Sequence, residues 1–482
     1  MKTIFAKSVP GRGAFCIESD APKAADMLPA GLLRKEEPGL PQCSELDVVR
    51  HFTGLSKLNY SVDANFYPLG SCTMKYNPKF TEYVAALPGF ARLHPMLAQL
   101  GGAAGCTQGA LQCMYEAENM LCELTGMKAF TLQPMAGANG EFVGVKLIAA
   151  YHKAKGRDRK KMLIPDAAHG TNPASAALAG FETINLESRH GMVDPEAIIE
   201  AIRKHGEDVA GLMMTCPNTL GLMEVHLPRI VAELRKIDAL LYYDGANMNA
   251  IMGKMRVGDV GFDVVHLNVH KTLSTPHGGG GPGAGPVGVS ECLLPFLPAP
   301  RVRKREDGSY FLDYDVPQSI GYMGPFYGSF GVMVKALAYM LRLGGEGLTR
   351  ASKYAVLNAN YLKKKLENTL DIPYADRLCA HEFVASAPQE TRALDIAKAL
   401  LDRGFHAPTI YFPLIVHECI MAEPTETESK ETLDSFVQAL EEIMLQAKSD
   451  PQALLDAPVT LPARRMDETG AARNMILTED MA

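Results

Sequence analysis

Short apolar runs alternate with amphipathic segments through the middle of the chain. Five runs have the length and the aliphatic content of buried strands, and they cover residues 161–165, 181–187, 210–215, 239–244 and 263–269. Between them, residues 194–205 and 227–237 repeat apolar positions at helical spacing, and each segment has a proline in its first turn. Strands and helices that alternate at these lengths predict crossover units. We therefore expect an α/β fold with a mainly parallel sheet covered on both faces.

The remaining pattern predicts what flanks this sheet. Residues 1–60 are interrupted by prolines and charges, apart from a helical segment at 44–56, and we interpret them as an N-terminal arm. A helical pattern over residues 105–125 stops at Gly126, and a longer one covers residues 328–368.

The long helical pattern leads into what we interpret as a second, smaller domain. We place the large α/β domain at residues 61–340 and a C-terminal α+β domain at residues 341–482. The smaller domain combines strands at 382–387 and 409–415 with a helix at 429–449, and a proline-rich tail follows that helix. We expect the tail to wrap the surface.

Composition excludes several classes of function. The formal net charge of −7 gives no electrostatic reason to expect a nucleic acid or an anionic membrane as a partner. No stretch approaches the ~18 consecutive apolar residues of a membrane span, and the N-terminus is a poor secretory signal. The 10 cysteines include no Cys-x-x-Cys pair, which argues against a zinc site and favours free thiols in a reducing compartment. We therefore expect a cytoplasmic protein without a metal site.

The segment that carries the most chemistry is DVVHLNVHKTLSTPHGGGGPGAGPVGV, residues 263–289. Its strand is expected to end at His270 and Lys271, and a glycine-rich loop follows. A lysine at the end of a buried strand is unusual, because an isolated buried charge is costly. A covalent imine between this lysine and an aldehyde cofactor removes the difficulty. A lysine that simply reaches solvent is the competing interpretation.

A second residue supports a cofactor. The run 239–244 ends at Asp244, so one strand–helix–strand step separates it from Lys271. Both residues would then lie at the carboxyl edge of neighbouring parallel strands, where open α/β sheets bind ligands. A pyridoxal ring needs an acidic residue at its nitrogen and a lysine at its aldehyde. Aspartate is also a common helix cap, so Asp244 is informative through its pairing with Lys271.

A phosphate site is predicted in QPMAGANGE, residues 133–141. Small residues there lead into a helix expected to start at residue 141. Gly137, Ala138 and Asn139 are candidates to bind the cofactor phosphate through backbone N–H groups. An ordinary helix start is the competing interpretation.

A stacking residue is predicted in IPDAAHGTNPASA, residues 164–176. His169 stands between a strand and a helix that is expected to begin at Pro173. Its imidazole is placed to stack on the cofactor ring, with Thr171 or Asn172 as the helix cap. A surface histidine is the competing interpretation.

Several longer segments resemble the glycine decarboxylase P-protein family, in particular subunit 2 of its split form. They are FYPLGSCTMKYNPK, AHGTNPASA, CPNTLGLME, DGANMNA, HLNVHKTLSTPHGGGGPGAGPVGV and TETESKETLD. The resemblance extends from about residue 45 to the tail. It implies the aspartate-aminotransferase-like fold, which is fold type I of the pyridoxal 5′-phosphate enzymes. It also implies a pyridoxal-phosphate-dependent glycine dehydrogenase (decarboxylating) of the glycine cleavage system.

The resemblance also implies roles for individual residues. Lys271 would form the imine, Asp244 would pair with the pyridine nitrogen, and His169 and Ala246 would flank the ring. We expect Lys271, Asp244 and His169 to be the catalytic residues. The expected cofactor-binding set is Lys271, Asp244, His169, Ala246, Gly137, Ala138, Asn139, Thr171 and His270. The sequence departs from the family at two positions, since Asn139 stands where histidine or glutamine is expected and Cys216 where asparagine is expected.

The resemblance further implies partners. In this family glycine loses CO₂, and the aminomethyl group passes to the lipoyl arm of the H-protein. Loops 70–75 and 274–283 are candidates to line a channel for that arm, and Cys72 in the first loop is either an inert thiol or a redox group. At 482 residues the chain is about half the length of a fused P-protein, so subunit 1 is the expected partner in an α₂β₂ heterotetramer.

Other functions fit the sequence less well. Gly283-x-Gly285-x-x-Gly288 has the spacing of a dinucleotide-binding loop, but it leads into a strand and not a helix. A phosphate-binding loop fails because Lys271 lacks the preceding glycine. An aminotransferase or aldolase would keep Lys271 and Asp244 and differ only in the reaction. A non-catalytic half of a complex would not need Lys271.

Overall fold

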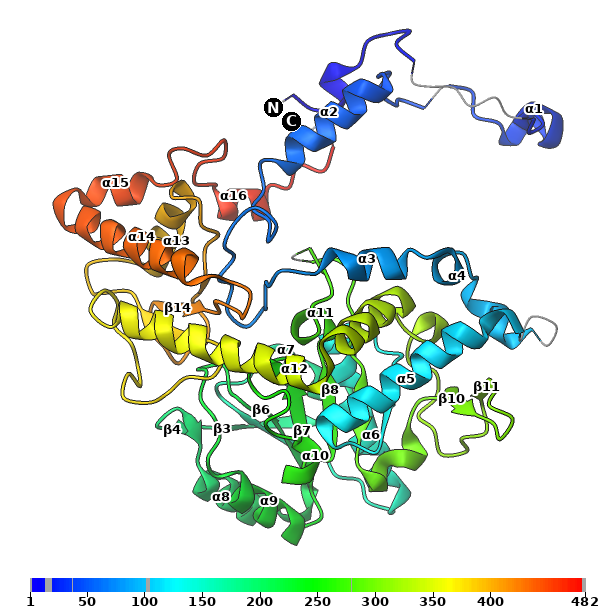
Figure 1. Ribbon diagram of the computed structural model, residues 1–482, viewed down its shortest axis with the longest axis vertical. Coiled ribbons are helices and arrows are strands. Elements are labelled where there is room, and N and C mark those ends of the chain that lie inside the picture. The colour runs from blue at the N-terminus through cyan, green and yellow to red at the C-terminus, as the bar shows by residue number, and fades with distance from the viewer. Residues whose placement is uncertain (1, 14–19, 37, 101–104, 279, 479–482) are drawn as a thin grey trace. The chain divides into compact units, whose positions relative to one another are not determined.

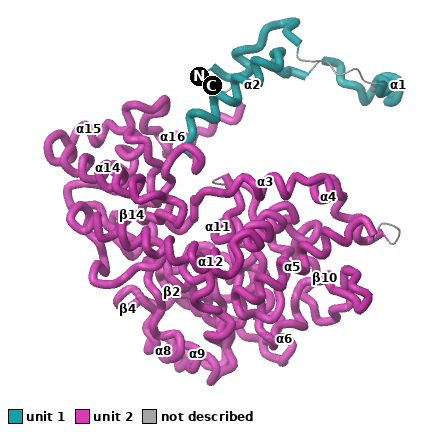
Figure 2. The backbone as a smooth tube through the Cα atoms, in the orientation of Figure 1, with its two compact units in different colours: residues 1–60 teal, residues 61–482 magenta. Residues whose placement is uncertain are grey.

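The computed structural model describes residues 2–13, 20–36, 38–100, 105–278 and 280–478. The chain divides into two compact units, Met1–Tyr60 and Ser61–Ala482, which Figure 2 shows in teal and magenta. No helix in these described ranges has both the length and the apolar character of a membrane span.

The first unit contains short helical turns and one longer helix. Its elements are η1 (Phe5–Lys7), α1 (Ala24–Met27), η2 (Ala30–Leu32) and α2 (Glu45–Ser56). Helix α2 starts where the sequence predicts a helix, because Ser44 and Asp47 form a capping box. The Ser44 side chain accepts a hydrogen bond from the Asp47 N–H, and the Asp47 carboxylate accepts one from the Ser44 N–H.

A seven-stranded sheet lies at the centre of the second unit. Its strand order is β1-β9-β8-β7-β6-β2-β3. The strands are β1 (Ala129–Thr131), β2 (Lys161–Pro165), β3 (Glu182–Leu186), β6 (Val209–Thr215), β7 (Leu240–Gly245), β8 (Val264–Leu267) and β9 (Val287–Val289). Neighbours from β3 to β8 pair in parallel, whereas β9 is antiparallel to both β8 and β1. The predicted mainly parallel sheet is confirmed.

Helices bury both faces of this sheet. They are α5 (Gln108–Thr125), α6 (Gly137–Ala154), α7 (Thr171–Leu178), α8 (Pro195–His205), α9 (Leu227–Lys236), α10 (Val257–Val260) and α11 (Val269–Thr272). Side chains alternate along β7, so the fully buried Tyr242 packs in the cluster with α6, and Tyr243 packs in the cluster with α5, α8 and α9. Figure 1 shows α8 and α9 side by side at one face.

Shorter elements surround the sheet. They are α3 (Lys79–Ala85), α4 (Pro88–Ala91), η3 (Pro95–Gln99), β4 (Ser188–Arg189), β5 (Met192–Val193), η5 (Gly206–Asp208), η6 (Met248–Ala250), η7 (Glu291–Phe296), β10 (Arg301–Lys304), β11 (Tyr310–Asp313) and η8 (Pro325–Tyr327). Strands β10 and β11 form an antiparallel hairpin.

Helix α12 (Phe330–Leu366) joins the large sheet to the C-terminal elements, as Figure 1 shows in yellow-green to yellow. These elements are β12 (Phe383–Ser386), α13 (Ala393–Asp402), β13 (Thr409–Ile410), β14 (Cys419–Ala422), α14 (Lys430–Ser449), α15 (Pro451–Asp456) and α16 (Glu468–Arg473). All of them except α16 contribute to a hydrophobic cluster separate from that of the large sheet, and the three strands form an antiparallel sheet of order β12-β14-β13. The division predicted at residue 340 falls inside α12 and stays a prediction.

The C-terminal strand predicted at 409–415 is too long. Strand β13 ends at Ile410, because Tyr411 has a φ of 60°, in the left-handed region that does not continue a strand. The predicted strand at 382–387 and the predicted helix at 429–449 are confirmed within two residues at each end. The helical stretch predicted at 328–368 is confirmed over residues 330–366, with a break at Gly344, whose φ is 61°.

Candidate functional site

The sequence predicted that Lys271 stands at the end of a strand, and this prediction is wrong. Strand β8 ends at Leu267, and Lys271 lies in the short helix α11, one turn further along the chain. The end of the glycine-rich loop lies beside this segment. The N–H of Val269 donates to the carbonyl of Ala284 in that loop, and not to a residue of a neighbouring strand. The Lys271 side-chain nitrogen donates a hydrogen bond of 2.6 Å to the backbone carbonyl of Ser71.

Asp244 lies on the neighbouring strand, as predicted. Strands β7 and β8 are parallel, and Asp244 is directly opposite His266. The Asp244 carboxylate is buried, accepts a hydrogen bond of 3.0 Å from the Ala246 N–H and lies 3.4 Å from Nε2 of His266. Nδ1 of His266 lies 2.7 Å from the Tyr242 hydroxyl. Burial is the main cause that lowers the pKa of His266, so this ring is neutral at pH 7.

These residues line one cavity of about 210 Å³. Eight of the nine predicted cofactor-binding residues are among its lining: Gly137, Ala138, His169, Thr171, Asp244, Ala246, His270 and Lys271. The structure thus brings together predicted residues from four segments that are separate in the chain.

Asn139 is the predicted residue outside that lining. Helix α6 begins at Gly137, one turn earlier than expected, and the Asn139 side-chain oxygen accepts a hydrogen bond of 3.0 Å from the Met135 N–H. Its side chain thus fixes the loop before the helix. The backbone N–H groups of the first turn remain available to an anion, since first-turn N–H groups have no partner within a helix.

His169 lies at the cavity, but the predicted cap of the next helix is wrong. Helix α7 begins at Thr171, not Pro173, and no side chain caps it at Gly170. Thr171 bonds instead to the His169 ring, with 2.9 Å between its hydroxyl and Nδ1. Asn172 is fully buried inside the helix. Burial is the main cause that lowers the pKa of His169, so the ring is neutral at pH 7.

Seven residues that the sequence reading did not assign to a cofactor also line the cavity: Ser71, Glu141, Thr215, Thr219, Asn247, His266 and Asn268. Two local patterns in the sequence could have indicated three of these residues. Glu141 follows Gly137 by one helical turn, and His266 and Asn268 occupy alternate positions in the run predicted as a buried strand. Ser71, Thr215 and Asn247 come from loops and strand ends whose meeting depends on the tertiary structure.

The cavity fits pyridoxal phosphate. Lys271 supplies an amine, Asp244 a buried carboxylate and α6 a helix N-terminus for the phosphate. The side-chain oxygens of Thr215 and Asn268 are buried without a hydrogen-bond partner, so the cavity wall offers polar atoms to a ligand. A Cβ atom on Gly137 would lie 2.6 Å from the Asn268 oxygen, which shows how closely the backbone approaches this wall.

Ser71 is held by a buried carboxylate behind the cavity. Its φ is 61°, and its N–H donates a hydrogen bond of 2.6 Å to Glu382. Asn247 also donates to Glu382, at 3.2 Å. A ring nitrogen of His381 and one carboxyl oxygen each of Glu382 and Glu423 lie within 4.8 Å of one another. Burial raises the pKa of Glu382 to about 7 and that of Glu423 to about 8.

The two loops proposed as channel walls contact each other. Nε2 of His277 lies 3.4 Å from the Thr73 carbonyl, and the Ser274 hydroxyl donates at 2.9 Å to the carbonyl of Tyr76, the residue after the first loop. Gly279 of the second loop lies outside the described residues. Burial raises the pKa of Cys72, which keeps it a thiol at pH 7.

The other departure from the family pattern lies in the core. Cys216 is fully buried, burial raises its pKa to about 12, and its carbonyl accepts a hydrogen bond of 2.6 Å from Tyr243.

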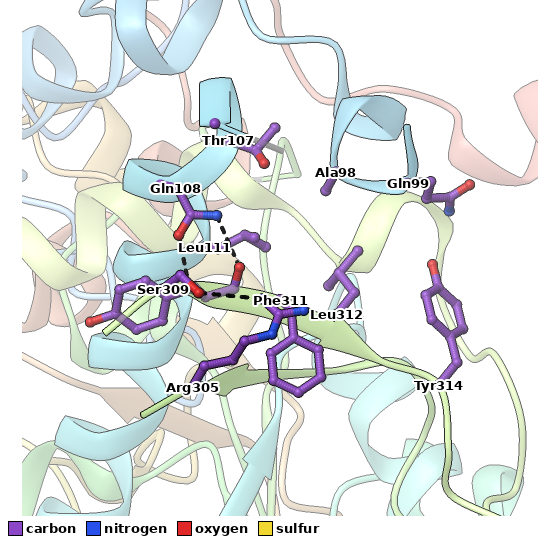
Figure 3. A pocket seen from close by; sticks show the side chains of 12 residues that line it. Ala98, Gln99, Thr107, Gln108, Leu111, Arg305, Ser309, Phe311, Leu312 and Tyr314 are labelled. Carbon is purple, nitrogen blue, oxygen red and sulfur yellow. Dashed lines mark hydrogen bonds between the residues drawn. The ribbon is translucent and has the colours of Figure 1, made fainter. Parts of the chain in front are cut away.

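A larger hollow, of about 730 Å³, lies away from these groups (Figure 3). Residues of η3, the start of α5 and the β10–β11 hairpin line it, and Arg305 stacks over the Phe311 ring at 4.0 Å. Gln108 exchanges hydrogen bonds with the backbone of Tyr310, at 2.9 and 2.7 Å. The residues that line this hollow include neither Lys271 nor Asp244, so we take the smaller cavity as the candidate active site.

Comparisons with known proteins agree on one family. The family model described as "Glycine dehydrogenase, C-terminal domain" matches residues 351–457. The chain is 54% identical to the "Probable glycine dehydrogenase (decarboxylating) subunit 2" of Caldanaerobacter subterraneus subsp. tengcongensis, over 98% of each chain.

Solved structures show the same fold. A glycine decarboxylase (P-protein) of the glycine cleavage system, in inhibitor-bound form, has a TM-score of 0.71 and 21% identity, covering 88% of this chain and 95% of that one. An aspartate aminotransferase of subgroup IV from Thermus thermophilus has a TM-score of 0.55 and 17% identity, covering 78% of this chain and 99% of that one. The predicted aspartate-aminotransferase-like fold is confirmed.

Proposed function

The chain belongs to the family of glycine dehydrogenase (decarboxylating) subunit 2, and we propose from this that it is the pyridoxal-phosphate-carrying subunit of a glycine decarboxylase in the glycine cleavage system. The enzyme removes the carboxylate of glycine as CO₂ and transfers the aminomethyl group to the lipoyl arm of the H-protein. One observation carries the proposal for the site, namely that Lys271 and Asp244 line the same cavity at the edge of neighbouring parallel strands.

The chain's residues have separate tasks in this reaction. When bound, pyridoxal phosphate supplies an aldehyde that captures an amine and a ring that accepts electrons. Lys271 provides the amine that holds the cofactor, and Asp244 provides the negative charge that keeps a proton on the ring nitrogen. The N-terminus of α6 would hold the phosphate through the N–H groups of Gly137 and Ala138. His169 and Ala246 also line the cavity and would contact the cofactor ring.

The surroundings of Lys271 support the exchange of one amine for another. As a free amine, the Lys271 nitrogen donates to the Ser71 carbonyl, 2.6 Å away. This hydrogen bond would keep the Lys271 amine inside the cavity whenever it is not bound to the cofactor. Asp244 itself is buried, and interactions between charges are stronger in buried surroundings than in water.

A partner subunit is part of the proposal. Relatives are named subunit 2, and we infer that subunit 1 completes an α₂β₂ heterotetramer in the cytoplasm. Helix α2 supports this inference, because Leu46, Val49 and Phe52 are each more than half exposed at positions three residues apart. Obligate interfaces of roughly 2,000–5,000 Å² bury apolar side chains of this kind. The proposal includes no metal ion.

The exchange of labelled bicarbonate into the carboxyl group of glycine tests the function. We expect exchange when this chain is mixed with subunit 1, pyridoxal phosphate and lipoylated H-protein, and none when Lys271 is replaced by alanine. An enzyme that transfers the amino group to a 2-oxo acid, without exchange, would contradict the proposal and favour an aminotransferase. Full exchange by this chain without subunit 1 would contradict the partner.

A further inference from the structure

We propose that Lys75 is a positioning residue for the cofactor lysine, because it caps the short helix α11 and thereby fixes the backbone from which the Lys271 side chain extends. Lys75 belongs to the segment FYPLGSCTMKYNPK, and the proposed function gives this lysine no task of its own. The consequence for catalysis rests on the proposed function, whereas the capping is inferred from contacts within the chain.

The argument starts at the end of α11. The helix ends at Thr272, the residue after Lys271. The last carbonyls of a helix have no partner within it. Here the chain cannot supply one by adding another turn, because the residue four positions after Thr272 is Pro276, which has no N–H. Thr272 is also buried. Its carbonyl therefore needs a donor from another part of the chain.

Lys75 supplies that donor. Its side-chain nitrogen donates a hydrogen bond of 2.8 Å to the Thr272 carbonyl and one of 2.7 Å to the carboxylate of Glu426. An ammonium group only donates and a carbonyl only accepts, so the direction of the bond to Thr272 is fixed. Lysine side chains that bond to terminal carbonyls in this way stabilise helix ends. The Lys75 nitrogen also lies 5.3 Å from the centre of the Tyr339 ring.

The burial of Lys75 makes the capping bond significant. Its side chain is only 1% exposed, and a buried charge is costly unless it has partners. Glu426 lies between β14 and α14 and neutralises the charge, and Tyr339 belongs to α12. An apolar side chain of similar length could occupy the same space, but it could not donate to Thr272. Lys75 therefore ties the end of α11 to the C-terminal elements.

The segment that contains Lys75 holds the cofactor lysine at two points. The Ser71 carbonyl accepts a hydrogen bond from the Lys271 amine, and Lys75 holds the carbonyl of the next residue, Thr272. The first bond is given up when the amine binds the cofactor, whereas the second can persist. A reacting group displaced by about 1 Å can lose on the order of 10²-fold in rate. A looser α11 should therefore slow the reactions of the Lys271 amine.

Two variants separate the cap from the ion pair. Lys75→Met removes both contacts and leaves Glu426 as a buried charge without its partner. Lys75→Met/Glu426→Leu removes that charge as well, and it should regain most of the stability that Lys75→Met loses, because apolar side chains often replace a buried ion pair without cost. The control is Arg301→Met/Glu118→Leu. It removes a buried ion pair of similar exposure, in which Glu118 also accepts a hydrogen bond from the Phe130 N–H.

Hydrogen exchange of the cofactor-free protein, measured by mass spectrometry, tests the cap directly. Peptides that cover residues 268–277 should exchange about tenfold faster in both Lys75 variants than in wild type, because the end of α11 has lost a buried hydrogen bond. The control variant should leave these peptides unchanged. Wild-type exchange there in Lys75→Met/Glu426→Leu would overturn the proposal. A double variant that does not fold would also overturn it, because Lys75 would then be needed for the fold as a whole.

Cofactor binding and kinetics test the positioning role. Lys75→Met/Glu426→Leu should bind pyridoxal phosphate about tenfold more weakly in a fluorescence titration. In the assembled enzyme, kcat for bicarbonate exchange should fall about tenfold while KM for glycine changes less than about threefold. The reason is that Lys75 is not among the residues that line the cavity and acts through the helix of Lys271. A purely structural role would give cofactor affinity and kcat equal to those of the control variant, which would overturn the proposal.

Failure of the proposed function would look different. Wild-type protein would then show no bicarbonate exchange, while the faster hydrogen exchange of residues 268–277 in the two Lys75 variants would remain. Weaker cofactor binding without faster hydrogen exchange would instead contradict the cap.

Discussion

The side-chain nitrogen of Lys271 donates a 2.6 Å hydrogen bond to the carbonyl of Ser71, which lies 200 positions earlier in the chain. The N–H of the same Ser71 residue donates to Glu382, so Ser71 is anchored on both sides. This anchoring explains how Ser71 keeps a left-handed φ of 61° without being glycine. The free lysine amine therefore has a fixed position in the cavity.

Reductive trapping should place the cofactor on Lys271. After borohydride treatment, we expect peptide mapping to find the pyridoxyl group on Lys271 and not on Lys75. Lys75 is buried and donates to Glu426 at 2.7 Å and to the Thr272 carbonyl at 2.8 Å. Burial lowers the pKa of Lys75, but the charge of Glu426 outweighs this and raises it above its usual value. A protonated amine does not attack an aldehyde. Label on Lys75 would show that the assignment is wrong.

Replacement of Asp244 by alanine should slow exchange by about 10²–10³-fold, because a preorganised charge is lost from a buried position. The enzyme should still contain its cofactor, which the absorbance of the purified variant would report. Asp238→Ala is the control, since Asp238 pairs with Lys155 and Arg157 at the surface. Near-normal exchange by the Asp244 variant would contradict its role.

Gly137→Ala should weaken cofactor binding by about 10–100-fold, because the new Cβ would lie 2.6 Å from the Asn268 oxygen and overpacking costs roughly 1–3 kcal/mol. Gly170→Ala provides the comparison, since nothing lies within 4 Å of a Cβ there and its φ of −59° suits alanine. Fluorescence titration of cofactor-free protein with pyridoxal phosphate measures both. Equal affinities would remove Gly137 from the phosphate site.

The stability of the cofactor-free protein should fall as pH rises through the pKa of Glu423. Burial, with the charge of Glu382, raises this pKa from 4.5 to about 8. The folded state therefore holds a proton that the unfolded state releases, and the resulting stability is complete below pH 4.5 and lost toward pH 8.

Glu423→Gln should flatten this dependence, with an effect on the order of 1–3 kcal/mol. Melting temperatures measured across the same pH range give the comparison with wild type. Parallel curves for the two proteins would show that Glu423 does not titrate in this window.

The fold was largely predictable because its signals are local. The five predicted strands pair as neighbours in one sheet, and Pro195 and Gly126 mark a helix start and a helix end where the pattern predicted them. Each of these features depends on a few adjacent residues. The end of β8 was not predictable in this way, because it depends on a contact with a distant residue. The carbonyl of Ala284 accepts the hydrogen bond of the Val269 N–H, and Lys271 lies in the short helix α11.

The site was predictable in its centre and not at its rear wall. Lys271 and Asp244 follow from the order of strands, since parallel neighbours end at one edge. Glu382 contacts Ser71 and Asn247 only after three distant segments meet, and no local pattern encodes that meeting. The roles assigned to the predicted residues stay predictions until the variants are measured.

The antiparallel strand β9 sets the timing of folding during synthesis. Strand β1 lies at one edge of the seven-stranded sheet, where the neighbouring strand is β9, with Ala129 opposite Val289. At roughly 5–20 residues per second, a ribosome needs on the order of 10–30 s to make the intervening chain. Throughout that interval the strand that carries Ala129 and Phe130 has no neighbouring strand, and exposed apolar surface of this kind is what makes nascent chains prone to aggregation. Glu382 emerges later still, so a newly made chain acquires the anchor of Ser71 only near the end of translation.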